Sequence, residues 1–131
     1  MKPVYQTRVG ENGNCFQAAV ASILDLELEQ VPDFCNDDPE RWFLNLCDWL
    51  RQFNLTAMMI GAGKKWNDDI AHVLKDVHLL AGGRSAVRPF DHEVVYLNGE
   101  MVHDPAPEGK GLKGWPKDFI LFVATKPEDN V

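Results

Sequence analysis

An Asn-Gly dipeptide between two strand-like runs constrains the fold of this chain more than any other feature. Asn98-Gly99 follows residues 92–97, which read His-Glu-Val-Val-Tyr-Leu, and precedes residues 100–105, which read Glu-Met-Val-His-Asp-Pro. Asn-Gly favours the left-handed backbone of tight hairpin turns, and Val and Tyr are typical of strands. The sequence therefore predicts a β-hairpin that begins near His92 and ends near Asp104.

Two loops are compatible with this hairpin, and they differ in register. A two-residue loop, Asn98-Gly99, would pair Glu93 with Asp104 and would place His92 and Asp104 on opposite faces of the sheet. A three-residue loop that also includes Leu97, with its glycine left-handed and a bulge, would pair His92 with Asp104. We predict the three-residue loop, because a type I turn of this kind suits the x-Asn-Gly sequence.

The rest of the chain predicts helices followed by strands. Helices followed by mostly antiparallel strands imply an α+β fold in which the first helix packs on the sheet, within one domain spanning residues 1–131. The predicted helices are residues 14–26, 39–53 and 66–74, and the predicted strands outside the hairpin are residues 55–60, 77–81 and 119–123. The second helix carries an apolar stripe of Trp42, Leu46, Trp49, Leu50 and Phe53.

Cys15 stands at the start of the first predicted helix, after Gly13-Asn14 and before an apolar run. Backbone N–H groups at a helix N-terminus lack partners and carry the positive end of the helix dipole, so they favour a thiolate and can hold an oxyanion. Taken alone, a cysteine in such a helix is more often a small buried hydrophobic residue. The chain order Cys15, His92, Asp104 favours a nucleophile with its base and an orienting acid.

Three segments resemble the papain-like cysteine peptidase superfamily. The resemblance is closest to C39-like peptidases and to the small stand-alone proteins of bacteria and phages that share the pattern. In this superfamily Gln, Cys, His and Asp or Asn follow one another along the chain, and that order is kept here. The segments are residues 6–16, 92–95 and 102–105, whereas residues 35–88 carry almost none of the resemblance.

The resemblance implies a papain-like fold and a role for each of four residues. Their roles would be nucleophile for Cys15, general base and acid for His92, orientation of the imidazole for Asp104, and oxyanion donor for Gln6. Gln6 lies nine positions before Cys15, farther than is usual in papain-like enzymes. Asn12 or Asn14 could donate to the oxyanion instead.

The other cysteines and histidines lack such a setting. We expect Cys47 to be a core residue and Cys35 a thiol in a loop. His103 should face the opposite side of its strand from Asp104, and it is the reserve base if the predicted register is wrong. The chain has no Cys-x-x-Cys pair and no His-Glu-x-x-His helix, so we expect neither a metal nor another cofactor.

Composition narrows the classes of partner. The net charge of −7 argues against nucleic acid, because nucleic-acid binding generally needs a basic surface. An odd number of cysteines, no signal peptide and no apolar run of membrane-spanning length predict a cytoplasmic protein with free thiols and no membrane partner. We expect a protein or peptide substrate, and a monomer is compatible with the sequence.

The expected function is hydrolysis of an amide bond, in a peptide or an isopeptide, through Cys15, His92 and Asp104. Amidase or transglutaminase-type acyl transfer would use the same residues, because the triad does not encode the leaving group or the acceptor. A non-catalytic binding module also stays open, for example a phage factor that docks onto a host protein. Residues 61–66 and 81–90 are glycine-containing loops that could wall the cleft.

Overall fold

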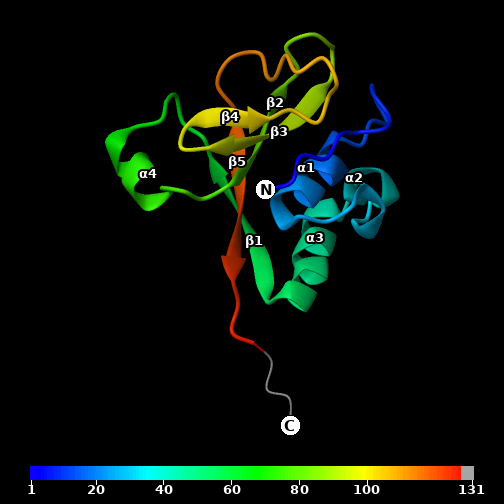
Figure 1. The fold of residues 1–131 in the computed structure, drawn as a ribbon, viewed down its shortest axis with the longest axis horizontal. Helices are drawn as coiled ribbons and strands as arrows, with labels where there is room; N and C mark the ends of the chain where they lie inside the picture. The colour runs from blue at the N-terminus through cyan, green and yellow to red at the C-terminus, as the bar shows by residue number, and fades with distance from the viewer. Residues whose placement is uncertain (128–131) are drawn as a thin grey trace.

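Three of the four helices precede the first strand in the computed structural model, which describes residues 1–127 (Figure 1). No helix in this part of the chain is long and apolar enough to cross a membrane. The helices are α1 (Cys15–Leu24), α2 (Phe34–Asp37), α3 (Trp42–Leu50) and α4 (Asp68–Val73), with 3₁₀ turns at Leu28–Gln30 and Arg51–Phe53. The strands are β1 (Leu55–Gly61), β2 (Leu79–Arg84), β3 (Asp91–Leu97), β4 (Glu100–His103) and β5 (Asp118–Ala124).

The strands form a five-stranded sheet in the order β1-β5-β2-β3-β4. Every neighbouring pair runs antiparallel. β2 lies between β3 and the last strand of the chain, so the centre of the sheet joins segments that are far apart in sequence. The predicted α+β class, with an N-terminal helix beside an antiparallel sheet, is confirmed.

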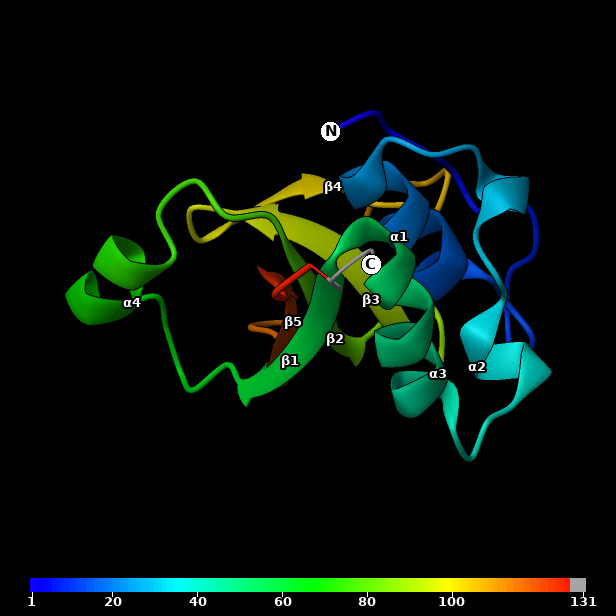
Figure 2. The same ribbon diagram turned by 90° about the horizontal axis from the view of Figure 1, so that it is seen from below.

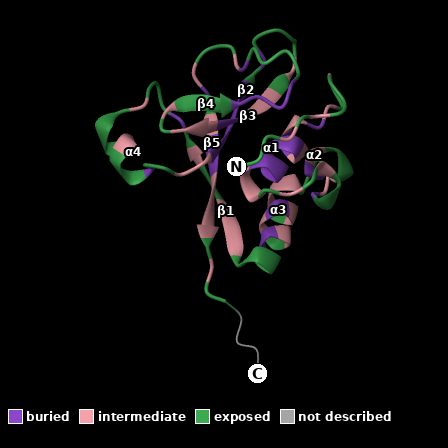
Figure 3. Cartoon of the chain, in the orientation of Figure 1, coloured by how far each residue is buried: buried purple, intermediate pink, exposed green. Residues whose placement is uncertain are grey.

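The helices α1 and α3 cover one face of the sheet, α2 packs against these two helices, and α4 lies on the other side of the sheet (Figure 2). Burial is greatest in α1 and in the central strands (Figure 3). On the helical side, Leu46 and Leu50 of α3 belong to one core cluster with Leu80, Val95 and Ile120 of the sheet. Each fully buried Leu, Val or Ile side chain contributes roughly 1.5–3 kcal/mol, so this layer holds α1 in place against β3.

Two predicted boundaries are wrong. The second predicted helix begins at Trp42 and not at residue 39. Asp38 precedes a proline and has a non-helical backbone, and a turn follows in which Arg41 N–H donates to the Asp38 carbonyl at 3.2 Å. The predicted loop at residues 81–90 begins too early. Gly82 and Gly83 continue strand β2, because they pair with Glu93 and His92 of β3.

The predicted three-residue hairpin loop is also wrong. Leu97 pairs with Glu100, so the loop is the two residues Asn98 and Gly99, both with positive φ of 52° and 84°. The Asn98 side chain explains this choice. Its Oδ1 accepts the Asp76 N–H at 2.8 Å and its Nδ2 donates to Asp76 Oδ1 at 3.0 Å, which fixes the left-handed asparagine.

The two-residue loop by itself would place Asp104 on the opposite sheet face from His92, but a β-bulge in β4 returns Asp104 to the face of His92. Tyr96 pairs with Met101, but Val95 pairs with His103, so Val102 is an extra residue in β4. Continued by one residue, this register places Asp104 opposite Val94, which shares a sheet face with His92. The bulge therefore brings His92 and Asp104 to the same face, as we expected for a different reason.

Candidate active site

Cys15 is the first residue of α1 and is half-buried. The preceding residue, Asn14, does not cap the helix with its side chain. Its Oδ1 instead accepts the backbone N–H groups of Thr7 and Arg8, at 3.0 and 2.9 Å. Asn14 thus ties the N-terminal segment to the start of α1, and its side chain leaves the first N–H groups of the helix uncapped.

The rest of the Asn14 amide is also used. Its Nδ2 lies 3.0 Å from Thr7 Oγ1 and 3.3 Å from Gln17 Oε1. Gln17 in turn donates to the carbonyls of Leu28 and Val31, at 3.1 and 2.8 Å. Asn14 is therefore a positioning residue for the helix start, and it has no free amide hydrogen to offer an oxyanion.

His92 and Asp104 are in direct contact. His92 Nε2 lies 2.6 Å from Asp104 Oδ1, and the two side chains are only 9% and 4% exposed. Asp104 Oδ1 also accepts the Ala106 N–H at 2.9 Å, and Asp104 Oδ2 accepts the Gly111 N–H at 2.7 Å. The carboxylate is held on both oxygens, so the imidazole that it contacts has a fixed orientation.

These contacts keep Asp104 ionised. Burial by itself would raise the pKa of Asp104, but the hydrogen bonds from His92, Ala106 and Gly111 and the charge of His92 outweigh burial and lower it. A buried carboxylate with this many donors is a stable negative partner for a positively charged ring.

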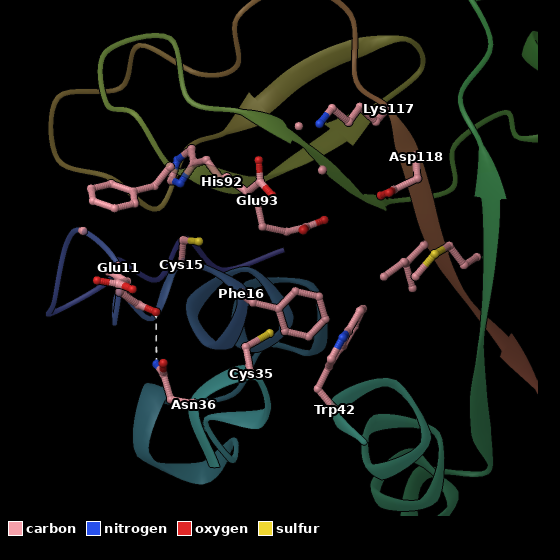
Figure 4. A pocket seen from close by; sticks show the side chains of 18 residues that line it. Glu11, Cys15, Phe16, Cys35, Asn36, Trp42, His92, Glu93, Lys117 and Asp118 are labelled. Carbon is pink, nitrogen blue, oxygen red and sulfur yellow. Dashed lines mark hydrogen bonds between the residues drawn. The ribbon is translucent and has the colours of Figure 1, made fainter. Parts of the chain in front are cut away.

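The Cys15 side chain lies beside the imidazole of His92 (Figure 4). Burial by itself would lower the pKa of His92. The hydrogen bond to Asp104, the interaction with Cys15 and the negative charge of both partners outweigh burial and raise the pKa to about 10. Because Asp104 occupies Nε2, the nitrogen left for the sulfur is Nδ1. The raised pKa favours the imidazolium form of His92, which lies between the Asp104 carboxylate and the Cys15 sulfur.

Gln6 reaches the same site. Its backbone N–H donates to the Pro105 carbonyl at 3.0 Å, and its side chain lines a small cavity with Cys15 and His92. Its Nε2 donates to the Arg8 carbonyl at 2.9 Å, which uses one of the two amide hydrogens. Gln6 therefore keeps one N–H bond for a ligand beside Cys15.

The remaining candidates lie elsewhere or differ from expectation. His103 Nε2 lies 2.7 Å from the Val4 carbonyl, on the side of the strand away from Asp104. Cys47 is half-buried, with its Sγ 3.8 Å from the Ala57 carbonyl. Cys35 is not in a loop. It lies on α2 and lines a cavity with Cys15, and burial together with nearby negative charge raises its pKa to about 12.

A cavity of about 430 Å³ opens beside Cys15 and His92 (Figure 4). Of the two segments expected to wall the cleft, residues 81–90 contribute Gly82, Gly83 and Phe90, whereas residues 61–66 contribute none of the described lining. Four acidic residues that sequence reasoning missed also line this cavity, namely Glu11, Asp91, Glu93 and Asp118. The available signal was the strand alternation, in which Glu93 shares a face with the buried Val95.

No family model, curated protein or solved structure matches this chain. Within residues 1–127, no group of three or more His, Cys, Asp or Glu side chains is arranged to hold a metal ion. Function is therefore inferred from the geometry of Cys15, His92 and Asp104 alone.

Proposed function

We propose that the protein is a papain-like cysteine hydrolase that cleaves an amide bond, in a peptide or an isopeptide. The observation that carries this proposal is the buried contact of His92 with Asp104, with the other side of the imidazole beside a cysteine that starts a helix. A nucleophile, a base and an orienting acid in contact form the arrangement that acyl transfer needs. The α1 helix packed against β3 also fits a papain-like fold.

The reaction would proceed through a thioester. The Cys15 thiolate attacks the carbonyl carbon, and the oxyanion accepts hydrogen bonds from the Cys15 N–H and Gln6 Nε2. The imidazolium of His92 gives its proton to the leaving nitrogen as the C–N bond breaks. His92 then removes a proton from water, which attacks the thioester. The C–S bond breaks, the acid leaves and the thiolate is restored.

The same residues would support acyl transfer to an amine, which replaces water in the second step. This alternative differs only in the acceptor, and a transglutaminase or amidase reaction is distinguished by the product formed with an added primary amine. The reducing cytoplasm that we propose for this protein would keep Cys15 as a free thiol.

A non-catalytic binding module is less well supported. Asp104 and His92 are almost completely buried, and burying an ion pair carries a desolvation cost that its attraction does not always offset. A protein that only docks onto a partner does not require a buried His92–Asp104 ion pair. The burial of these charges next to a thiol favours chemistry.

The test is the rate at which iodoacetamide alkylates Cys15, followed by intact mass from pH 5 to pH 9. At pH 6 we expect Cys15 to react at least about tenfold faster than an ordinary thiol, which is only about 0.3% ionised there. His92→Ala should abolish this faster alkylation, because it removes the imidazolium beside Cys15. Asp104→Ala should reduce the rate, because it removes the carboxylate that stabilises the imidazolium. Cys15→Ser identifies the labelled site. A Cys15 that reacts like an ordinary thiol whether or not His92 is present would rule out the proposed function.

A further inference from the structure

Two carboxylates lie in register across the centre of the sheet. Gly82 of β2 pairs with Glu93 of β3 on one side and with Asp118 of β5 on the other. Residues directly opposite each other in an antiparallel sheet project to the same face. Glu93 and Asp118 therefore point the same way across Gly82, into the cavity beside Cys15 (Figure 4).

The neighbouring row shows which face this is. Two residues further along each strand, Leu80 pairs with Val95 and with Ile120, and all three side chains are buried in the core beneath α1 and α3. The row of Glu93, Gly82 and Asp118 continues this helix-facing surface out of the core. An apolar surface thus becomes acidic at the point where it reaches the cavity.

The glycine leaves the space between the carboxylates empty. A Cβ at Gly82 would lie 2.8 Å from Asp118 Oδ1 and 3.1 Å from Glu93 Oε1, so any other residue would push between them. Gly82 does not have a positive φ, so the backbone alone does not require glycine here. The absence of a side chain keeps both carboxylates open to the same volume.

Glu93 lacks the partner that a buried carboxyl group normally has. Its Oε2 is buried and has no hydrogen-bond partner among residues 1–127. Burial raises the pKa of Glu93 well above its usual range, and the negative charges of Cys15, Asp118 and Asp91 add to this, while His92 opposes it. A cation bound beside Glu93 would also oppose this shift and favour the ionised carboxylate. Lys117 also lines the cavity, but it forms no ion pair with either carboxylate in the described chain.

We propose that this cavity is a subsite for a basic side chain of the substrate, whose cationic group binds between Glu93 and Asp118. This inference rests on the proposed function and adds a substrate class to it. Arginine should be favoured over lysine, because its planar guanidinium donates in a fork that two carboxylates can share. Phe16 and Trp42, which pack edge to face with ring centroids 5.2 Å apart, line the same cavity and offer apolar contact to the aliphatic part of that side chain.

The first test measures binding without chemistry, in the full-length Cys15→Ala variant. The probes are acetyl-Gly-Arg-amide and acetyl-Arg-Gly-amide, each compared with the peptide in which neutral, nearly isosteric citrulline replaces arginine. Titrations followed by NMR should give at least one arginine peptide a Kd about tenfold or more below that of its citrulline counterpart. Glu93→Gln and Asp118→Asn should each reduce this ratio. Equal Kd values for arginine and citrulline would overturn the subsite.

A second pair of variants leaves the carboxylates unchanged. Gly82→Ala places a methyl group between Glu93 and Asp118 and should remove the preference for arginine. Gly61→Ala is the matched control, because Gly61 is also a strand glycine without a positive φ and its Cβ would meet nothing within 4 Å. A folded Gly82→Ala protein that still prefers arginine would contradict the proposed position of the cation.

Covalent labelling separates this inference from the proposed function. Dipeptidyl chloromethyl ketones that differ only in arginine or citrulline are reacted with the parent protein, and the rates at Cys15 are compared as a ratio. A fast, His92-dependent reaction with iodoacetamide but an arginine-to-citrulline ratio near one would support the enzyme and reject the subsite. An ordinary Cys15 in a protein that still prefers the arginine peptides would reject the enzyme and keep the acidic site.

Discussion

Asp104 has more contacts than orientation of an imidazole requires. One oxygen faces His92 and the Ala106 N–H, and the other accepts the Gly111 N–H, so each hydrogen-bond partner of the carboxylate is a donor. An asparagine at this position would turn an NH₂ group toward one of those donors. The backbone N–H groups of the loop after β4 therefore favour a carboxylate at position 104 as much as His92 does.

The Asp104→Asn variant should have a flatter acid stability profile than the parent. Because the folded-state pKa of Asp104 is lowered, its contribution to stability is present above the unfolded pKa of about 3.9 and is lost as the pH falls through the folded value. Urea unfolding from pH 2 to pH 6 should therefore show the parent losing stability more steeply below about pH 4 than the variant. Parallel profiles would show that Asp104 is not the group being titrated.

The hairpin is the element on which the site depends most. Gly99 has a φ of +84°, and a Cβ there would lie 2.7 Å from Trp66 Cγ. The turn is thus constrained by the backbone and by a side chain from the segment before α4. A shift in the turn would move the bulge in β4 and, with it, the face on which Asp104 lies.

Gly99→Ala should destabilise the protein by about 1–3 kcal/mol, because backbone strain and the contact with Trp66 act together. Gly109→Ala is the control, since Gly109 also has a positive φ, of +64°, but a Cβ there would meet nothing within 4 Å. The free energy of unfolding, measured in urea, should fall further for Gly99→Ala than for Gly109→Ala. Equal losses would mean that Trp66 does not constrain the turn.

Local patterns predicted most elements but not the details that shape the site. The apolar run after Cys15 and the stripe through Leu46 and Leu50 identified α1 and α3 because helical periodicity is a local signal. The helix α2 has only four residues, too few to show a period. The bulge at Val102 arises from pairing between strands, and no residue type marks it.

At the scale of the whole molecule, the candidate site joins two layers. Cys15 belongs to the helical layer, whereas His92 and Asp104 belong to the sheet and its adjoining loop. Their contact depends on the core between the layers, where Leu80 is completely buried. The row of Glu93, Gly82 and Asp118 could likewise be recognised only in the three-dimensional structure. β2 and β5 become neighbours through a crossover that sequence spacing does not reveal.

Leu80→Ala should lower the free energy of unfolding by about 2–5 kcal/mol, because it leaves a cavity beneath α1 and α3. Val73→Ala, at a side chain that is 74% exposed, should change it by no more than about 0.5 kcal/mol.

Urea transitions followed by tryptophan fluorescence and by His92-dependent alkylation of Cys15 should coincide in the parent. Loss of the alkylation signal well before the fluorescence change would show that the layers separate without global unfolding.

His92 and Glu93 are consecutive residues of β3, and they project to opposite sides of the strand. His92 lies against Asp104 at the edge of the cavity, and Glu93 projects into the cavity beside Asp118. A single inserted or deleted residue at this point would exchange the two directions and disable both. Within β3, a substitution at position 93 would therefore change the acidic side chain alone, whereas a change in strand length would also displace His92.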